Sequence, residues 1–181
     1  MSAGNDADQV AACLGGDNKA FEALMRKYYQ PVFNVALRML REPTDAEDIA
    51  QTVFIKAYEK LDTYNPRHQF FSWVYRIAIN ESINASKKSK RLDEYESGVS
   101  AALKETQVES VGQDELVEAL DEAITLLTVD YRMVIVLRHY HDFSYQEIGE
   151  ILDIPEKTVK SRLFTARQRL KEILEKQGVV R

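Results

Sequence analysis

The segment 155–181 concentrates basic side chains in a chain that is acidic overall. It holds eight Lys or Arg residues against three Glu residues, so its net charge is +5, whereas the whole chain carries -5. Charge distributed this unevenly usually indicates an anionic partner at the basic end. These Lys and Arg side chains could therefore bind a polyanion and neutralise its charge.

At helical spacing this segment separates into an apolar stripe and a basic face. The stripe comprises Val159, Leu163, Ala166, Leu170 and Leu174, and the neighbouring face comprises Lys160, Ser161, Phe164, Arg167, Gln168 and Lys171. In a major groove, Phe164 could pack against thymine methyl groups while Lys160 and Ser161 contact base edges. Arg162, Arg167 and Arg169 would hold phosphates. The alternative is a solvated basic helix with Phe164 packed on a neighbouring element.

A helix-turn-helix would position this basic face. Ser144 and Glu147 form a capping box, in which each side chain satisfies a backbone N–H at the start of a helix. Asp153 and Ile154 follow as a short turn, and Pro155 suits the first position of the next helix. Two short helices joined by a tight turn, the second of them basic, are typical of a motif that binds duplex DNA.

A second candidate site is a polar row on a helix predicted at 70–87. Arg76, Asn80 and Asn84 recur at every fourth position, and Asn is a poor helix former, so the row requires a reason. Aromatic and basic residues accompany it, namely Tyr64, Phe70, Phe71, Trp73, Tyr75, Lys87, Lys88, Lys90 and Arg91. Rings with amide and basic groups suit unstacked single-stranded bases. Aromatic residues at helical spacing are, however, more often part of a core, and Trp73 is expected there in either case.

A third candidate is the histidine pair His139 and His141, with Asp142 beside it. Two residues apart on a helix, these imidazoles would diverge by about 160°, so we do not expect them to share a metal ion. The sequence contains no recognisable nucleophile–base set or phosphate-binding loop. We therefore expect no metal, no cofactor and no catalytic residue, and a helical enzyme or metal protein is the least favoured class of function.

The elements that position these groups are predicted to be helices, because strand-like alternation is nearly absent and the chain has only 7 Gly and 4 Pro. One helix follows Asp17, which can cap it, and Pro31 is expected to kink or divide it. The next opens with a capping box at Thr44 and Glu47. Its buried stripe comprises Ala46, Ile49, Ala50, Val53, Ala57 and Leu61. The segment 62–69 is a predicted loop.

Helical periodicity stops after the third predicted helix and resumes near Leu116. We therefore predict an all-α protein with two small helical domains, 1–87 and 113–181, joined by a flexible linker at 88–112. Cys13 has no second cysteine to pair with in the chain and suits a small buried hydrophobe. The N-terminus lacks a secretory signal, and no apolar run reaches about 18 residues, so we expect a cytoplasmic protein without direct membrane insertion.

Together these stretches resemble the bacterial extracytoplasmic-function (ECF, group 4) sigma factors, which are sigma-E-like, two-domain promoter-specificity subunits of RNA polymerase. The matching blocks, in the order of the family, are GDNKAFEALMRKYYQPVFNVALRML, DAEDIAQTVFIKAYEKLDTY, FFSWVYRIAINESIN and YRMVIVLRHYHDFSYQEIGEILDIPEKTVKSRLFTARQRLKE. They cover nearly the whole chain apart from the linker. Two positions depart from the pattern: many members carry Asp at the position of Asn84 and Leu-Pro at the position of Leu127-Thr128.

The resemblance implies that 1–87 is sigma region 2, which docks on core RNA polymerase and recognises and melts the −10 element. By match, the residues that contact the β′ clamp helices would be Asp48, Gln51, Phe54 and Ile55, of which the last two lie partly off the buried stripe. The alternative is that this helix packs only internally. A non-template base would be flipped into a pocket formed by the 63–71 loop. The residues of this −10 site would be Tyr64, Phe70, Arg76, Asn80, Asn84, Lys87 and Lys88.

The resemblance also implies that 113–181 is sigma region 4, which contacts the β flap and reads the −35 element of promoter DNA as duplex. Its site residues would be Lys160, Ser161, Arg162, Phe164, Arg167, Arg169 and Lys171. Such factors serve stress responses, and an anti-sigma factor, often membrane-bound, commonly holds them inactive. The polymerase performs the chemistry. A stand-alone helix-turn-helix regulator is the alternative, but it would need a dimerisation or ligand-sensing domain in place of the patterns in 1–87.

Overall fold

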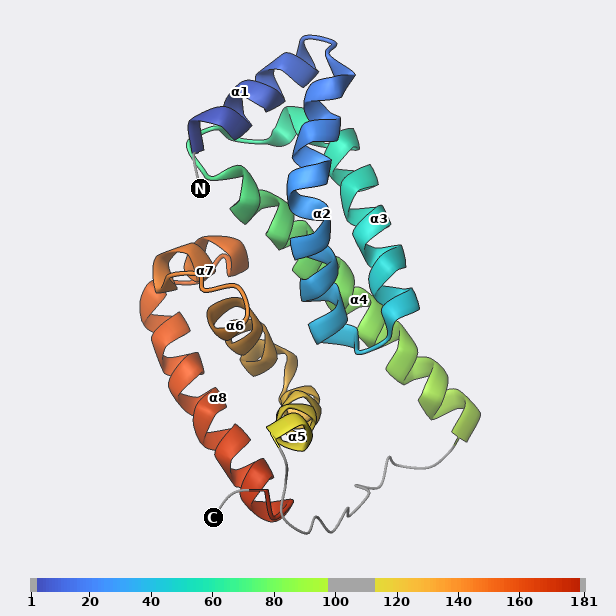
Figure 1. Ribbon diagram of the computed structural model, residues 1–181, viewed down its shortest axis with the longest axis vertical. Coiled ribbons are helices and arrows are strands. Elements are labelled where there is room, and N and C mark those ends of the chain that lie inside the picture. The colour runs from blue at the N-terminus through green and yellow to red at the C-terminus, as the bar shows by residue number, and fades with distance from the viewer. Residues whose placement is uncertain (1–2, 98–112, 180–181) are drawn as a thin grey trace. The chain divides into compact units, whose positions relative to one another are not determined.

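The computed structural model describes residues 3–97 and 113–179, and in these ranges its regular elements are eight α-helices and one short 3-10 helix (Figure 1). The chain divides near residue 85 into two compact units. The prediction of an all-α protein with two helical domains is therefore confirmed. None of the helices in the described ranges has the length and apolar character that a membrane crossing requires.

The first unit contains α1 (Ala3–Leu14), α2 (Asn18–Leu40), α3 (Pro43–Glu59), the 3-10 helix η1 (Leu61–Thr63) and the first half of α4 (Phe70–Ser97). Figure 1 shows α2 and α3 side by side, and α1 packs against α2 and η1. The core is built from apolar side chains of all four helices. The largest of those that are fully buried are Phe70, Leu24, Met39, Val32, Val35, Val53 and Val74.

Helix α2 is continuous through Pro31, so of the two predicted outcomes, a kink or a division, the division is wrong. Proline removes one backbone donor from the helix. Val32 and Val35, the buried residues that follow it, anchor the helix in the core, and burial of such side chains contributes about 1.5–3 kcal/mol each. The predicted N-cap is confirmed, because the Asp17 carboxylate accepts a hydrogen bond from the backbone N–H of Lys19 at 3.0 Å.

Helix α3 begins two residues earlier than predicted, with Pro43 as its first residue. The Glu42 side chain accepts a hydrogen bond from the N–H of Thr44 at 3.4 Å, so Glu42 is the N-cap and the predicted capping box at Thr44 and Glu47 is wrong. Proline favours this position because its fixed backbone angle suits a helix start. The predicted buried stripe is confirmed, with Ile49 half-buried and the other five residues buried.

Two features of the first unit differ from the prediction. Helix α4 continues to Ser97, ten residues beyond the predicted helix end at Lys87, so the first part of the segment predicted as a linker is helical. The remainder of that segment, 98–112, lies outside the described residues. Helix α1 was not predicted, because its buried apolar residues Val10 and Cys13 are few and its third buried side chain, Asp6, is charged. Cys13 is buried as expected, and burial raises the pKa of its thiol.

The second unit contains α5 (Gln113–Leu126), α6 (Val129–His139), the first part of α7 (Tyr145–Leu152) and α8 (Glu156–Lys176), with α8 packed against α5 and α6. The capping box of α7 is confirmed, since the Ser144 N–H donates to the Glu147 carboxylate at 2.7 Å and the Glu147 N–H donates to the Ser144 hydroxyl at 3.2 Å. Pro155 was predicted to be the first residue of α8. It is instead the N-cap, and the helix begins one residue later, at Glu156.

Candidate nucleic-acid interfaces

Helix α8 presents the predicted basic face to solvent. All five residues of the predicted apolar stripe are buried, and all six residues of the neighbouring face are exposed. Phe164 is 66% exposed, although an aromatic ring of this size normally packs against apolar neighbours. The alternative in which Phe164 packs on a neighbouring element is therefore wrong.

The charged groups on α8 have acidic partners close by. Lys160 pairs with Glu156 at 2.6 Å and lies over the Tyr145 ring at 5.7 Å from its centroid. Further along, Arg169 pairs with Glu172 at 3.1 Å and Lys171 with Glu175 at 3.6 Å. Exposed pairs of this kind contribute only about 0–1 kcal/mol, so phosphates or base edges can replace these carboxylates at little cost.

Two arginines of the predicted set contact side chains of α6. Arg162 is half-buried and pairs with Asp130 in the first turn of α6 at 3.2 Å. Arg167 lies 3.3 Å from the His139 ring nitrogen at the end of α6. Burial and the positive charges of Arg167 and Arg138 lower the pKa of His139. Arg162 thus joins α8 to α6, and a phosphate would have to compete with Asp130 for it.

The histidine pair does not form a shared site. Helix α6 ends at His139, so the two imidazoles do not lie on one helix, and the expected helical divergence does not apply. Instead they have different neighbours: His139 lies beside Arg167, and His141 stacks on Phe143 at 6.1 Å. Among the side chains that the structure describes, no group of three or more His, Cys, Asp or Glu residues could hold a metal ion.

The polar row of α4 is exposed along its length. Arg76, Asn80 and Asn84 are all exposed, as are Lys87 and Lys88 one turn further on. The opposite side of α4 packs into the first unit through Phe71, Val74, Tyr75, Ala78 and Ser82. These amides and basic groups are therefore accessible from solvent, and their role stays a prediction.

The aromatic residues next to this row divide into a buried and a half-buried set. Phe70 is only 1% exposed, so its ring is part of the core and the prediction that it contacts DNA directly conflicts with the structure. As the first residue of α4, it turns inward between Tyr28 at 5.6 Å, Tyr64 at 5.5 Å and Trp73 at 5.6 Å between ring centroids. Tyr64 and Trp73 are half-buried, so Trp73 is less buried than expected.

The loop between η1 and α4 is closed by its own hydrogen bonds. The Tyr64 hydroxyl donates to the backbone carbonyl of His68 at 2.7 Å, and the Asn65 side chain accepts from the Arg67 N–H at 3.0 Å. Burial, and next the negative charge of Asp6, raise the pKa of Tyr64, so its hydroxyl keeps the proton that it donates. The loop is thus held in one shape beside the polar row of α4.

Helix α3 presents a mixed polar and apolar face. Asp48, Gln51 and Ile55 are exposed, with Ile55 60% exposed, whereas Phe54 is only 4% exposed and stacks on Tyr29 at 6.0 Å. The prediction that Phe54 lies off the buried stripe is wrong, because it follows Val53 on the side of α3 that packs against α2. Tyr58, which was missed, is 47% exposed. The spacing of Gln51, Ile55 and Tyr58 on one helical face was the signal that could have identified it.

Comparison with known proteins matches both units to one family. The family model of sigma-70 region 2 matches residues 24–92, and that of sigma-70 region 4 matches residues 117–170. The chain is 35% identical over 170 residues to the ECF RNA polymerase sigma factor SigW of Bacillus subtilis (strain 168), covering 88% of this chain and 91% of that protein. It is 36% identical over 166 residues to the ECF RNA polymerase sigma-E factor of Escherichia coli (strain K12), covering 84% and 85%.

Solved structures agree with these matches. The sigma factor RpoE, in its complex with the anti-sigma factor NepR from Bartonella quintana, superposes with a TM-score of 0.68 at 27% identity, covering 87% of this chain and 98% of that one. CnrH, in complex with the cytosolic domain of CnrY, shares the fold with a TM-score of 0.72 at 22% identity, covering 94% and 97%.

The two matched regions define the class, a sigma-70-type factor that retains regions 2 and 4. The chain belongs to the ECF RNA polymerase sigma factors, and it is a promoter-specificity subunit, as the resemblance implied. A stand-alone helix-turn-helix regulator is not favoured, because the first unit matches region 2 rather than a sensing or dimerisation domain. Sigma factors are not enzymes, which agrees with the expectation that the polymerase performs the chemistry.

Proposed function

We propose that the second unit reads the −35 element as duplex through α8, while the first unit recognises and melts the −10 element. The observation that carries the proposal is the exposed ring of Phe164 in the middle of a basic face. A large apolar side chain held in water is unfavourable in the free protein, whereas in a major groove it can contact thymine methyl groups. In this division, 1–87 and 113–181 are the two functional domains and 88–112 connects them.

At the −35 element, Lys160, Ser161 and Phe164 contact base edges, and other basic residues bind the backbone. The phosphate-binding set is Arg162, Arg167, Arg169 and Lys171. Before Lys160 can donate to a base, its ammonium group must leave Glu156, at 2.6 Å in the free protein. Because that pair is exposed, the exchange costs at most about 1 kcal/mol.

At the −10 element, we propose that a flipped non-template base lies between the 64–69 loop and the polar row of α4. A flipped base exposes its Watson–Crick edge and needs new hydrogen-bond partners, which Arg76 and Asn80 supply. The half-buried rings of Tyr64 and Trp73 offer stacking surfaces, and such stacking contributes about 1–3 kcal/mol per base. Asn84, Lys87 and Lys88 continue the row and contact the neighbouring nucleotides, while Phe70 supports the rings from the core.

For polymerase docking, we propose the α3 face formed by Asp48, Gln51, Ile55 and Tyr58 as the surface that contacts the β′ clamp helices. Ile55 and Tyr58 provide exposed apolar area, and Asp48 and Gln51 provide polar contacts around it, an arrangement typical of protein interfaces. Phe54 acts beneath this surface by fixing α3 on α2. The second unit contacts the β flap, so both units are positioned by the polymerase.

We further propose that an anti-sigma factor binds this chain, as NepR binds the RpoE of Bartonella quintana. An anti-sigma factor anchored in the membrane would couple this chain to an extracytoplasmic signal. Since the polymerase and the promoter are cytoplasmic, the factor works in the cytoplasm.

The proposed function is tested by reconstituting core RNA polymerase with this protein and transcribing genomic fragments. We expect discrete run-off products whose start sites share paired −35 and −10 elements. Core polymerase without the protein serves as the control. Run-off products that share neither element, or that do not depend on the protein, would contradict the proposal.

A further inference from the structure

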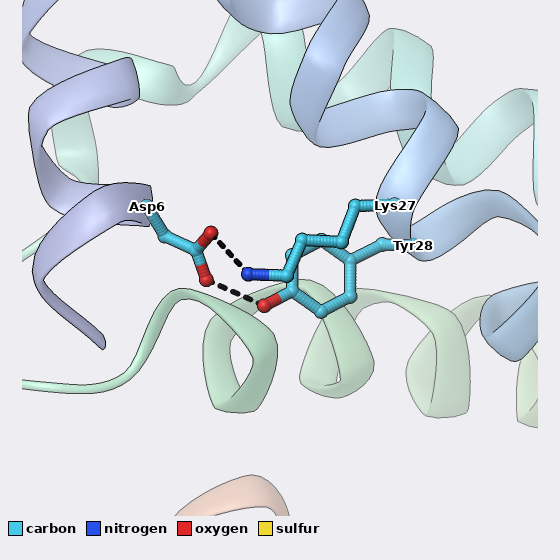
Figure 2. Close-up of polar contacts among 3 residues, drawn as sticks. All are labelled: Asp6, Lys27 and Tyr28. Atoms are coloured by element: carbon cyan, nitrogen blue, oxygen red, sulfur yellow. Dashed lines mark hydrogen bonds and ion pairs between the residues drawn. The ribbon is translucent and has the colours of Figure 1, made fainter. Parts of the chain in front are cut away.

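A buried carboxylate ties the N-terminal helix to the first unit. Asp6 of α1 is only 4% exposed, and Figure 2 shows its two oxygens directed at successive residues of α2. One oxygen lies 2.5 Å from the Lys27 ammonium nitrogen, and the other accepts a hydrogen bond from the Tyr28 hydroxyl at 2.5 Å. Both oxygens are thus satisfied by groups from one helix.

Helix α1 is also held on the first unit by apolar side chains. Val10 and Cys13 already bury apolar surface on the same helix. Burying a carboxylate carries a desolvation penalty of several kcal/mol, and an ion pair often does no more than offset it. What the carboxylate adds is a fixed position for the phenol, because the Tyr28 hydroxyl can donate to Asp6 only when the long axis of its ring points at that carboxylate.

The orientation of the Tyr28 ring matters to the loop beside α4. Tyr28 contacts Phe70 at 5.6 Å between ring centroids, and Phe70 contacts both half-buried rings of the proposed −10 site, Tyr64 at 5.5 Å and Trp73 at 5.6 Å. Tyr64 in turn donates to the carbonyl of His68 across the loop at 2.7 Å. A continuous set of contacts therefore joins Asp6 to the rings and the loop, although Asp6 itself is buried away from solvent.

Burial and the hydrogen bond to Asp6 raise the pKa of Tyr28 well above the usual range of a phenol, so Tyr28 keeps its proton and remains the donor. Helix α1 also lies outside the part of the chain that matches sigma region 2, which begins at residue 24. The contact between Asp6 and Tyr28 therefore joins an element that precedes the matched region to the proposed −10 site inside it.

We propose that Asp6 is a positioning residue for −10 recognition. Its carboxylate fixes the Tyr28 ring, which supports Phe70, and Phe70 holds Tyr64, Trp73 and the loop in the arrangement that receives a flipped base. This inference rests on the proposed −10 function of the first unit. Through Asp6, α1 would therefore contribute to promoter melting.

The test uses core polymerase loaded with full-length Asp6→Asn, Tyr28→Phe or the double variant, on a promoter identified by run-off transcription. Two quantities are measured: affinity for the single-stranded non-template −10 oligonucleotide, and permanganate reactivity of the −10 region. We expect Asp6→Asn to weaken both about tenfold, within the range of coupling through packed side chains. In the Tyr28→Phe background, Asp6→Asn should have little further effect, because the hydroxyl through which it acts is gone.

Met39→Ala is the matched control for lost stability, because Met39 is buried near the C-terminal end of α2, eleven residues after Tyr28. It should lower the thermal unfolding temperature at least as much as Asp6→Asn while leaving oligonucleotide affinity unchanged. Equal losses of affinity in Met39→Ala and Asp6→Asn, or none in Asp6→Asn, would overturn the inference.

Asn80→Ala separates this inference from the function on which it rests. If Asn80→Ala weakens oligonucleotide binding and Asp6→Asn does not, only the positioning role is wrong. If Asn80→Ala has no effect either, the −10 assignment of the first unit fails.

Discussion

The two proposed DNA-binding regions are built in different ways. In the second unit, one helix carries the whole proposed site: the buried side of α8 packs against the unit, and we propose that the exposed side contacts DNA. In the first unit, the proposed site combines a loop, the start of α4, and rings supported by α2 and, through Asp6, by α1. The −35 site should therefore respond to changes in exposed side chains, whereas the −10 site should also respond to residues that never touch DNA.

This difference in construction agrees with the two proposed functions, reading duplex DNA at −35 and capturing an unstacked base at −10. A base pair in duplex DNA already presents its groove edge, so a rigid helix with correctly placed side chains is sufficient to read it. A base that must leave the stack needs a receptor shaped in advance, because unstacking costs a few kcal/mol before any contact is made. Buried support for Tyr64 and Trp73 is one way to build such a receptor.

The largest effect should come from changes in the proposed polymerase-docking surface of α3, because binding at both promoter elements depends on the polymerase. Replacing Gln51 and Ile55 together by Ala should abolish specific promoter binding by the assembled polymerase, because central interface residues contribute about 2 kcal/mol or more each. Both side chains are exposed, so the fold should be unchanged. Binding of the variant to core polymerase measures the effect, with Glu22→Ala, an exposed residue on α2, as the control. Normal binding of the double variant would exclude this α3 face as the docking surface.

Next in size is the effect of the polar row on melting. Asn80→Ala and Arg76→Ala should reduce −10 opening about tenfold or more, because the flipped base loses a hydrogen-bond partner at a cost of about 1–3 kcal/mol. Binding to the isolated −35 element should not change. Permanganate footprinting measures opening directly. Wild-type opening by both correctly folded variants would show that the base-receiving site lies elsewhere.

A smaller and more local effect is expected on α8. Phe164→Ala and Lys160→Ala should each cost about 1–3 kcal/mol and relax preference at one or two −35 positions. Arg169→Ala, which removes a proposed phosphate contact, is the matched comparison. It should weaken binding to all DNA sequences equally and reduce the slope of log K against log salt concentration by about 0.9. Selection on randomised −35 elements distinguishes these outcomes. An unchanged sequence preference in both Phe164→Ala and Lys160→Ala would contradict the assignment.

The smallest effect concerns the buried phenol. Because the pKa of Tyr28 is raised in the folded protein, its stabilising contribution is complete below the unfolded-state value of about 10 and is lost as pH rises above it. The free energy of unfolding should therefore fall between about pH 10 and 11 by up to about 1.4 kcal/mol per pH unit for this group. Urea titrations of wild type and Tyr28→Phe measure it. Equal slopes in the two proteins would show that Tyr28 is not the responsible group.

The sequence was sufficient to predict the exposed face of α8 and the polar row of α4, because both follow from the angular spacing of residues on a single helix. It was not sufficient for Phe54 and Phe70. Phe54 lies at the edge of its stripe, and only its stacking on Tyr29 of α2 decides that it is buried. Phe70 opens α4, where the direction of the ring depends on α2 and the preceding loop.

The contact between Asp6 and Tyr28 was missed for a related reason. A charged residue in a short, weakly apolar segment predicts an exposed position, since Asp is seldom buried without a partner. The partners, Lys27 and Tyr28, come from a different helix about twenty residues later, and local periodicity carries no information about that pairing. Burial of Asp6 became visible only when α1 was seen packed on α2.

The most direct test of the central claim is a titration of labelled promoter with this protein alone and with the protein bound to core polymerase. The free chain carries a net charge of -5, which opposes approach to DNA despite the basic face of α8. We predict weak binding by the free protein and tight binding, dependent on both the −35 and −10 elements, only with core polymerase. Tight, sequence-specific binding to both elements by the free protein would contradict the account.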